Sequence, residues 1–136
     1  MNFKIIATVA TVALCCVCGT ACFSQKSVPK AVREAFSKKF PGVSDVDWGK
    51  EKNGEWEAEF EIGKVETTAN FSADGTWLET ETEIPVADLP APVRAALQGK
   101  KIKEAARIER ADGSTVFEAE VGRKDLLFDS AGKPLN

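Results

Sequence analysis

Residues 54–63 of the sequence, GEWEAEFEIG, carry a glutamate at every second position. The positions between these glutamates are apolar: Trp56, Ala58, Phe60 and Ile62. Because successive side chains of a β-strand point to opposite faces of a sheet, this alternation predicts a strand with one apolar face and one acidic face. The segment FEAEV at 117–121 alternates in the same way, so a second strand of this kind is expected.

Two stretches of the sequence recur at a constant spacing. VPKAVREAF at 28–36 aligns with LPAPVRAAL at 89–97, and WEAEF at 56–60 aligns with FEAEV, in both cases at an offset of 61 residues. The shared order and offset predict a tandem duplication. The segment EIPVADLPAP between the copies is rich in proline, which is typical of a boundary between structural units.

Each copy is expected to begin with an amphipathic helix. The apolar residues of the first helix recur every four positions and form one stripe: Val28, Val32, Phe36 and Phe40. The second helix has a similar stripe: Leu89, Val93, Ala96 and Leu97. The first helix should end at Pro41-Gly42 and the second near Gly99, because proline and glycine are common stop signals.

Turn signals follow each helix at intervals of nine to eleven residues: Asn53-Gly54, Gly63-Lys64, Asp74-Gly75, Asp112-Gly113, Gly122-Arg123 and Ala131-Gly132. This spacing predicts short antiparallel strands in a meander. The expected strands lie near 45–52, 55–62, 65–72, 76–83, 104–111, 115–121 and 124–129, with a last strand at 133–136. Asn53-Gly54 further predicts a two-residue type I′ hairpin, in which both central residues have positive φ.

The fold class expected from these patterns is α+β. Two tandem repeats, each a helix followed by antiparallel strands, would pack their helices on one face of a β-meander sheet. We expect an export leader at 1–24, the first repeat at 25–85 and the second at 86–136. A unit of about sixty residues buries only ~60% of its unfolded surface, so the two repeats should share their cores.

The N-terminal segment has the layout of a secretory signal peptide. Lys4 precedes an apolar run from Ile5 to about Gly19, and small residues follow. This run is shorter than the roughly 20 residues that a membrane-spanning helix needs. All four cysteines lie in the first 22 residues, so cleavage would leave no pair that could form a disulfide. The protein is therefore expected to be exported to the periplasm.

Cys22 is a candidate for lipidation, which would anchor the exported protein to the membrane. The residues before Cys22, Gly-Thr-Ala, resemble a bacterial lipobox, but Gly19 occupies the position where that motif usually has leucine. Ordinary cleavage nearby, for instance after Ser24, is the alternative. Apart from the leader and this anchor, no contact with a membrane is expected.

The composition excludes several classes of site. The chain of 136 residues has no histidine, the commonest general acid/base and metal ligand, and it has no tyrosine. Its formal charge is only −3, and it lacks a basic stripe of the kind that binds nucleic acid. It also lacks a phosphate-binding glycine loop, a nucleophile elbow and a metal-ligand cluster. We therefore expect no catalytic residues, no metal site, no cofactor and no nucleic-acid partner.

The glutamate row is interpreted as the solvated face of a half-buried sheet. Neighbours on one face of a strand lie roughly 6.6–6.8 Å apart, which is too far for two carboxylates to share a proton. A second acidic row occupies the ETETE segment: Glu79, Glu81 and Glu83. Trp56 is assigned to the core, whereas Trp77 fits either the core or a binding surface. The candidate partner-binding residues are Glu57, Glu59, Glu61, Trp77, Glu118 and Glu120.

These residues resemble a known family. VPKAVREAFSKKFPGVSDVDW, NGEWEAEFEIG and NFSADGTWLE together resemble the PepSY-like family of exported bacterial proteins, which is related in fold to the β-lactamase inhibitor proteins. The second copy keeps Leu89-Pro90 and FEAEV but lacks the Phe40-Pro41 pair. The resemblance implies helices on one side of an antiparallel sheet. It also implies an open opposite face, which grips a partner protein in the inhibitor relatives.

Three functional hypotheses are compatible with the sequence. The first is a non-enzymatic periplasmic protein that binds a protein or peptide on its open sheet face, in the manner of an inhibitor of a peptidase or β-lactamase. The alternative is an envelope sensor or accessory protein that binds a small ligand or a cation. The third is a hydrolase that uses carboxylates alone, which would require two buried acids in one cleft.

Overall fold

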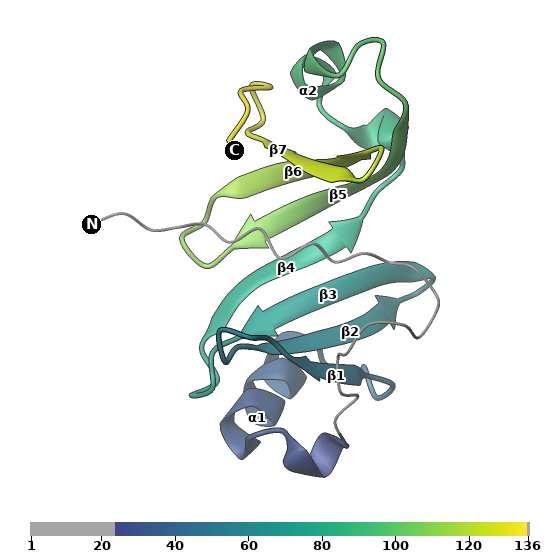
Figure 1. Cartoon of the computed structure of the whole chain (residues 1–136). Helices are drawn as coiled ribbons and strands as arrows, with labels where there is room; N and C mark the ends of the chain where they lie inside the picture. The colour runs from purple at the N-terminus through teal and green to yellow at the C-terminus, as the bar shows by residue number, and fades with distance from the viewer. Residues whose placement is uncertain (1–23, 136) are drawn as a thin grey trace, which may run out of the picture.

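The computed structural model describes residues 24–135, which form seven strands, two α-helices and two short 3₁₀ helices (Figure 1). The predicted leader, except for Ser24, lies outside the described residues, and so does Cys22. The helical elements are η1 (Gln25–Ser27), α1 (Lys30–Lys39), η2 (Val86–Asp88) and α2 (Ala91–Ala96). The strands are β1 (Asp47–Lys50), β2 (Trp56–Ile62), β3 (Val65–Phe71), β4 (Trp77–Glu83), β5 (Ile102–Arg110), β6 (Thr115–Val121) and β7 (Lys124–Phe128).

The strands form one sheet in which each strand pairs antiparallel with the next, in the order β1 to β7. The predicted meander is confirmed, and the α+β class agrees with it. The last predicted strand, at 133–136, is wrong in extent: among the described residues it is reduced to an isolated bridge between Phe128 and Pro134. The tandem duplication stays a prediction, although each helix does precede a run of antiparallel strands.

The helix α1 packs on the β1–β4 half of the sheet through aromatic contacts. The ring of Phe36 meets Phe60 edge-on with centroids 5.0 Å apart, and it meets Trp48 at 5.3 Å. These contacts explain the apolar stripe of the sequence, because every fourth residue of α1 returns to the sheet. The buried residues of this core are Val28, Val32, Phe36, Trp48, Trp56, Ala58, Phe60, Ala69 and Phe71.

A second core lies under α2 on the β5–β7 half of the sheet. Its buried residues are Leu89, Val93, Leu97, Ala105, Ala119 and Phe128. The two helices lie near opposite ends of the sheet, beside β1–β3 and β5–β7 respectively (Figure 1). The sheet itself is continuous between them through the pairing of β4 with β5.

The loop at Asn53-Gly54 differs from the predicted type I′ turn. The amide of Glu51 donates to the carbonyl of Glu55 at 2.8 Å, and the amide of Gly54 donates back to Glu51 at 2.9 Å, which closes a three-residue loop. Only Gly54 has a positive φ, 91°, so the type I′ prediction is wrong. Asn53 stays at negative φ, and its Oδ1 accepts from the amide of Glu55 at 3.0 Å.

Two loops that contain glycine, one ending at Gly75 and one at Gly132, lie against the helices. The loop that ends at Gly75 lies against the first turn of α1, where a Cβ on Gly75 would come within 2.6 Å of the carbonyl oxygen of Ala31. A Cβ on Gly132 would come within 2.5 Å of the carbonyl oxygen of Pro92, in the first turn of α2. Each helix therefore starts against a backbone that has no room for a side chain.

This close approach predicts a stability difference between two glycines with the same backbone angle. A Cβ at Gly75, where φ is 90°, would clash with the backbone of Ala31. A Cβ at Gly54, where φ is 91°, would have no other atom within 4 Å. We expect Gly75→Ala to lower the free energy of unfolding by about 2–4 kcal/mol and Gly54→Ala by about 1–2 kcal/mol. Urea denaturation of both variants measures the difference. Equal losses would show that the contact with Ala31 does not hold α1.

Candidate functional site on the open sheet face

The strand register defines a sheet face that neither α1 nor α2 covers, called here the open face. Glu57, Asn70 and Glu79 lie directly opposite one another across β2, β3 and β4. One step along the strands, Thr68, Glu81 and Ile108 line up across β3, β4 and β5. Further over, Ala106, Glu118 and Leu127 line up across β5, β6 and β7.

The predicted parity of β2 is confirmed, but part of its predicted solvation is wrong. Trp56, Ala58 and Phe60 face α1 and are buried, and Glu59 and Glu61 are exposed on the other side. Glu57, however, is only 8% exposed. Ile62 was expected to pack under the helix and is instead 51% exposed, because β2 runs past the end of the core to its hairpin.

Glu118 on β6 departs from the prediction in the same way. It was expected on a solvated face, yet it is only 8% exposed, while Glu120 on the same face keeps partial access to solvent. Small neighbours explain where the carboxylates fit: Ala106 lies beside Glu118. At the other end of the face, a Cβ on Gly49 would lie 3.6 Å from Oε1 of Glu57.

Three carboxyl groups of the open face have strongly raised pKa values. Burial, a hydrogen bond with the carboxyl of Glu59 and the charges of Glu59 and Glu51 raise the pKa of Glu57 to about 7. Burial raises the pKa of Glu81 to about 8, with repulsion from Glu118, Glu79 and Glu57. We call Glu57, Glu81 and Glu118 the acidic centre.

Glu118 completes the acidic centre from β6. Burial first, and then the charges of Asp125, Glu79 and Glu120, raise the pKa of Glu118 to about 7. The three groups come from alternate strands of the sheet, and Glu81, between the other two, is repelled by both. A proton on any of them therefore stabilises the folded state near neutral pH.

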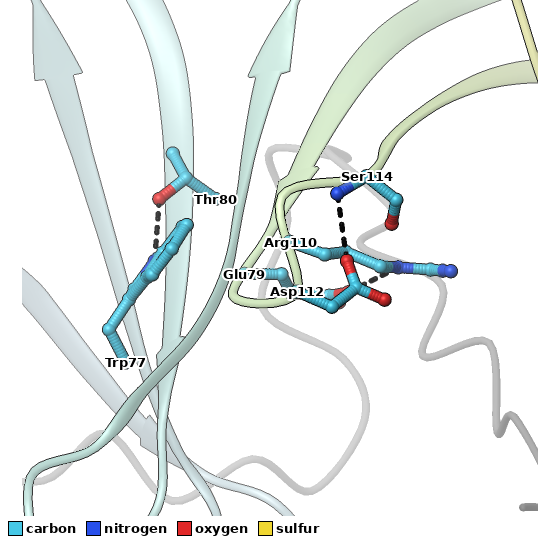
Figure 2. Close-up of polar contacts among 6 residues, drawn as sticks. All are labelled: Trp77, Glu79, Thr80, Arg110, Asp112 and Ser114. Atoms are coloured by element: carbon cyan, nitrogen blue, oxygen red, sulfur yellow. Dashed lines mark hydrogen bonds and ion pairs between the residues drawn. The ribbon is translucent and has the colours of Figure 1, made fainter.

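The cations near the open face are bound to other carboxylates. Arg110 pairs with Glu79 at 3.2 Å (Figure 2), and Lys103 pairs with Glu120 at 2.8 Å. Within residues 24–135, no ion pair reaches the acidic centre. Beside Glu57, the Oδ1 atom of Asn70 is also buried and accepts no hydrogen bond. In the described part of this face, Asn70 Oδ1 is therefore a buried acceptor without a donor.

An apolar cluster adjoins the acidic centre on the open face. Ile108, Val116 and Leu127, from β5, β6 and β7, are each buried to within a few per cent and form a small core of their own. Ile108 lies directly opposite Glu81, and Leu127 lies directly opposite Glu118. The open face thus combines unpaired carboxylates with apolar side chains at adjacent register positions.

Trp77 lies apart from the candidate glutamates. It pairs with Phe71 on the helix-covered face and packs against the first core, and its Nε1 donates to Oγ1 of Thr80 at 2.9 Å (Figure 2). Nζ of Lys39, at the end of α1, lies 3.4 Å from the centroid of its ring. Of the six predicted partner-binding residues, the structure brings the five glutamates to one face and leaves Trp77 on the other.

The structure adds Glu81 to the site, which the sequence analysis had placed only in a second solvated row. The missed signal was the strand register, because the central position of β4 in the sheet partly buries a side chain that simple alternation assigns to solvent. The described residues contain no group of three acidic, histidine or cysteine side chains that could hold a metal ion. Nor do they include a helix long and apolar enough to cross a membrane.

Comparison with known proteins identifies similar sequences and folds. The family model described as "Putative beta-lactamase-inhibitor-like, PepSY-like" matches residues 54–135. This match extends across the predicted boundary between the repeats and does not test it. A comparison with curated proteins gives no match.

Several solved structures share the fold. A structure described as a "BLIP-like protein" from Bacteroides fragilis has a TM-score of 0.65 and 26% identity, over 79% of this chain and 84% of that one. A "putative periplasmic" protein from Bacteroides eggerthii has a TM-score of 0.72 and 20% identity, over 80% and 86% of the two chains. A DUF2874 family protein from Bacteroides uniformis gives 0.71 and 19%, over 79% and 86%.

The acidic centre predicts a stability that falls as the pH rises. Because the folded pKa values of its carboxyls lie above 4.5, the folded state binds more protons than the unfolded state between about pH 4.5 and 8. Glu81→Gln removes one of these charges. We expect it to stabilise the protein by about 1–2 kcal/mol at pH 9 and by almost nothing at pH 5.

Urea unfolding at both pH values measures this effect, and Glu34→Gln on the exposed surface of α1 is the matched control. The control should change stability little and equally at both values. An equal response of the two variants would mean that Glu81 is solvated.

Proposed function

The chain belongs to the PepSY-like, beta-lactamase-inhibitor-like family, and on that premise we propose that it is a non-enzymatic exported protein that holds a protein or peptide on its open face. Neighbours described as periplasmic or BLIP-like support export and a protein partner. The periplasm is the proposed location, with an anchor through Cys22 as a further option. An inhibitor role would be one form of this binding.

The observation that carries the proposal is the burial of two carboxyl groups, Glu57 and Glu118, that make no ion pair with any described residue, on a face that no helix covers. Buried charges in folded proteins are normally paired, because an isolated charge loses its hydration without compensation. Glu57 and Glu118 break this rule at 8% exposure each. A surface that tolerates this cost gains most when a partner supplies the missing donors.

Catalysis is a weaker explanation of the same residues. Carboxyls with near-neutral pKa values suit proton transfer, and the burial of Glu57 and Glu118 meets one requirement of a carboxylate-only hydrolase. However, the direct strand neighbours of Glu57 are Gly49 and Asn70, and those of Glu118 are Ala106 and Leu127, none of which is a nucleophile. No observation favours the alternative of a cation or small-ligand sensor.

An affinity experiment tests the proposal at exposed positions, so that folding is preserved. The protein is immobilised and exposed to envelope extract, and any captured protein is purified and bound again in isolation. We expect Glu59→Lys with Glu61→Lys to lower the affinity for that partner about tenfold or more, since both residues flank the acidic centre. Glu34→Lys, on α1, should leave the affinity unchanged.

Equal affinities for the wild type and the double variant would contradict the use of the open face. So would a loss that is confined to the α1 variant. Identification of the captured protein would also show whether its own activity is inhibited in the complex.

A further inference from the structure

We propose that Asn53 is a site of spontaneous covalent modification, at which its side-chain amide is lost as ammonia and a carboxylate takes its place. Of the asparagines in the sequence, Asn53 is the only one that precedes a glycine. The pair Asn53-Gly54 lies in the three-residue loop that joins β1 to β2. This inference does not depend on the proposed partner of the open face.

The reaction joins two neighbouring groups of this loop. The backbone nitrogen of Gly54 gives its proton to solvent and attacks Cγ of Asn53, which forms an N–C bond and closes a five-membered succinimide ring. The bond between Cγ and Nδ2 breaks, and Nδ2 takes up a proton and leaves as ammonia. Water then adds to either carbonyl of the ring and opens it, which gives an aspartyl or an isoaspartyl residue. Water is the only co-reactant, and no group is oxidised or reduced.

The surroundings of the loop favour this attack. Asn53 is exposed, and a Cβ placed on Gly54 would meet no other atom within 4 Å, so the space beside the reacting peptide is open. Gly54 also has no side chain of its own to hinder the approach of Cγ. The amide of Glu55 donates to Oδ1 of Asn53 at 3.0 Å. Negative charge develops on this oxygen during the attack, so the hydrogen bond stabilises the intermediate.

One hydrogen bond of the loop opposes the reaction. The amide of Gly54 donates to the carbonyl of Glu51 at 2.9 Å, and this bond must open before the nitrogen can lose its proton. An exposed loop opens at a much lower free energy than a core strand, so this protection is weak.

Asn70 is the natural comparison within the described residues. It lies in β3, a strand paired on both sides, and the residue that follows it is the buried Phe71. Its Oδ1 is buried and accepts no hydrogen bond. The attack at Asn70 would require a core strand to leave the sheet, so the fold protects Asn70 and leaves Asn53 reactive.

Two other loops of this protein show that the aspartyl product fits. Asp74 and Asp112 precede the glycines of the loops between β3 and β4 and between β5 and β6. Each Oδ1 accepts from the amide two residues further on, at Thr76 (3.0 Å) and at Ser114 (2.8 Å). Asn53 uses its Oδ1 in the same way, so an aspartate there keeps this hydrogen bond.

The isoaspartyl product does not fit this loop. Its backbone runs through the former side chain and is longer by one carbon atom. The loop is closed by the hydrogen bond from the amide of Glu51 to the carbonyl of Glu55, at 2.8 Å. The extra carbon is expected to disrupt this closure and the pairing of β1 with β2 that follows it.

Ageing of the purified protein tests this inference. The folded protein is kept in warm buffer at neutral and at mildly alkaline pH and is then digested. Mass spectrometry compares the peptides that contain Asn53 and Asn70, and an isoaspartyl methyltransferase measures the isoaspartyl product. We expect Asn53 to convert at least about tenfold faster than Asn70, since loops open more often than core strands. Alkaline pH should accelerate the conversion, because hydroxide removes the proton from the amide of Gly54.

Two variants separate the chemistry from the folding. Asn53→Gln keeps an amide at this position but would have to close a six-membered ring through a longer side chain, so we expect it to lose the conversion. Asn53→Asp is the aspartyl product itself. It should keep the amide spectrum of the β1–β2 hairpin and the free energy of unfolding of the parent protein.

The contrary results are equally clear. Conversion of Asn53 no faster than that of Asn70 would overturn the inference, and so would an equally fast conversion in Asn53→Gln. A loss of the hairpin in Asn53→Asp would refute the claim that the aspartyl product fits the loop.

Discussion

The packing of the apolar row of β2 against α1 determines which side chains of this strand lie on the open face of the sheet. Phe60, Ala58 and Trp56 are held by the ring of Phe36 and its neighbours, so the strand cannot slip by one residue without exposing this whole row. The same constraint forces Glu57, Glu59 and Glu61 onto the open face. The second core under α2 acts in the same way on β6 and places Glu118 there.

Folding stability and surface chemistry therefore oppose each other in this protein. The cores need a continuous sheet, and the sheet brings acidic strands so close that their carboxylates repel one another. The folded state tolerates this because protons can occupy the acidic centre near neutral pH. A partner that donates hydrogen bonds to these carboxylates would do the same at higher pH, which links the binding of the partner to the loss of protons. The repulsion among these carboxylates is thus a local energetic cost, which the packing of the two cores offsets.

The sequence predicted the elements and faces that depend on local periodicity. It did not predict the features that depend on contacts between strands distant in the sequence. The positions of α1 and β2 followed from their apolar spacing, and the buried state of Trp56 followed from strand parity. The turn at Asn53 was missed because its side chain accepts a local hydrogen bond that favours a three-residue loop. The burial of Glu118 depends on its neighbours on β5 and β7, and the partial burial of Glu81 depends on its neighbours on β3 and β5. Alternation within one strand does not contain that information.

The most direct test of this account is the titration of the Glu81 side-chain carboxyl carbon by NMR in the free protein. The account predicts a pKa of about 8, with Glu57 and Glu118 titrating near 7. A titration of all three groups near 4.5, the ordinary value for glutamate, would contradict it. The carboxylates would then be solvated, and the open face would hold no buried charge for a partner to stabilise.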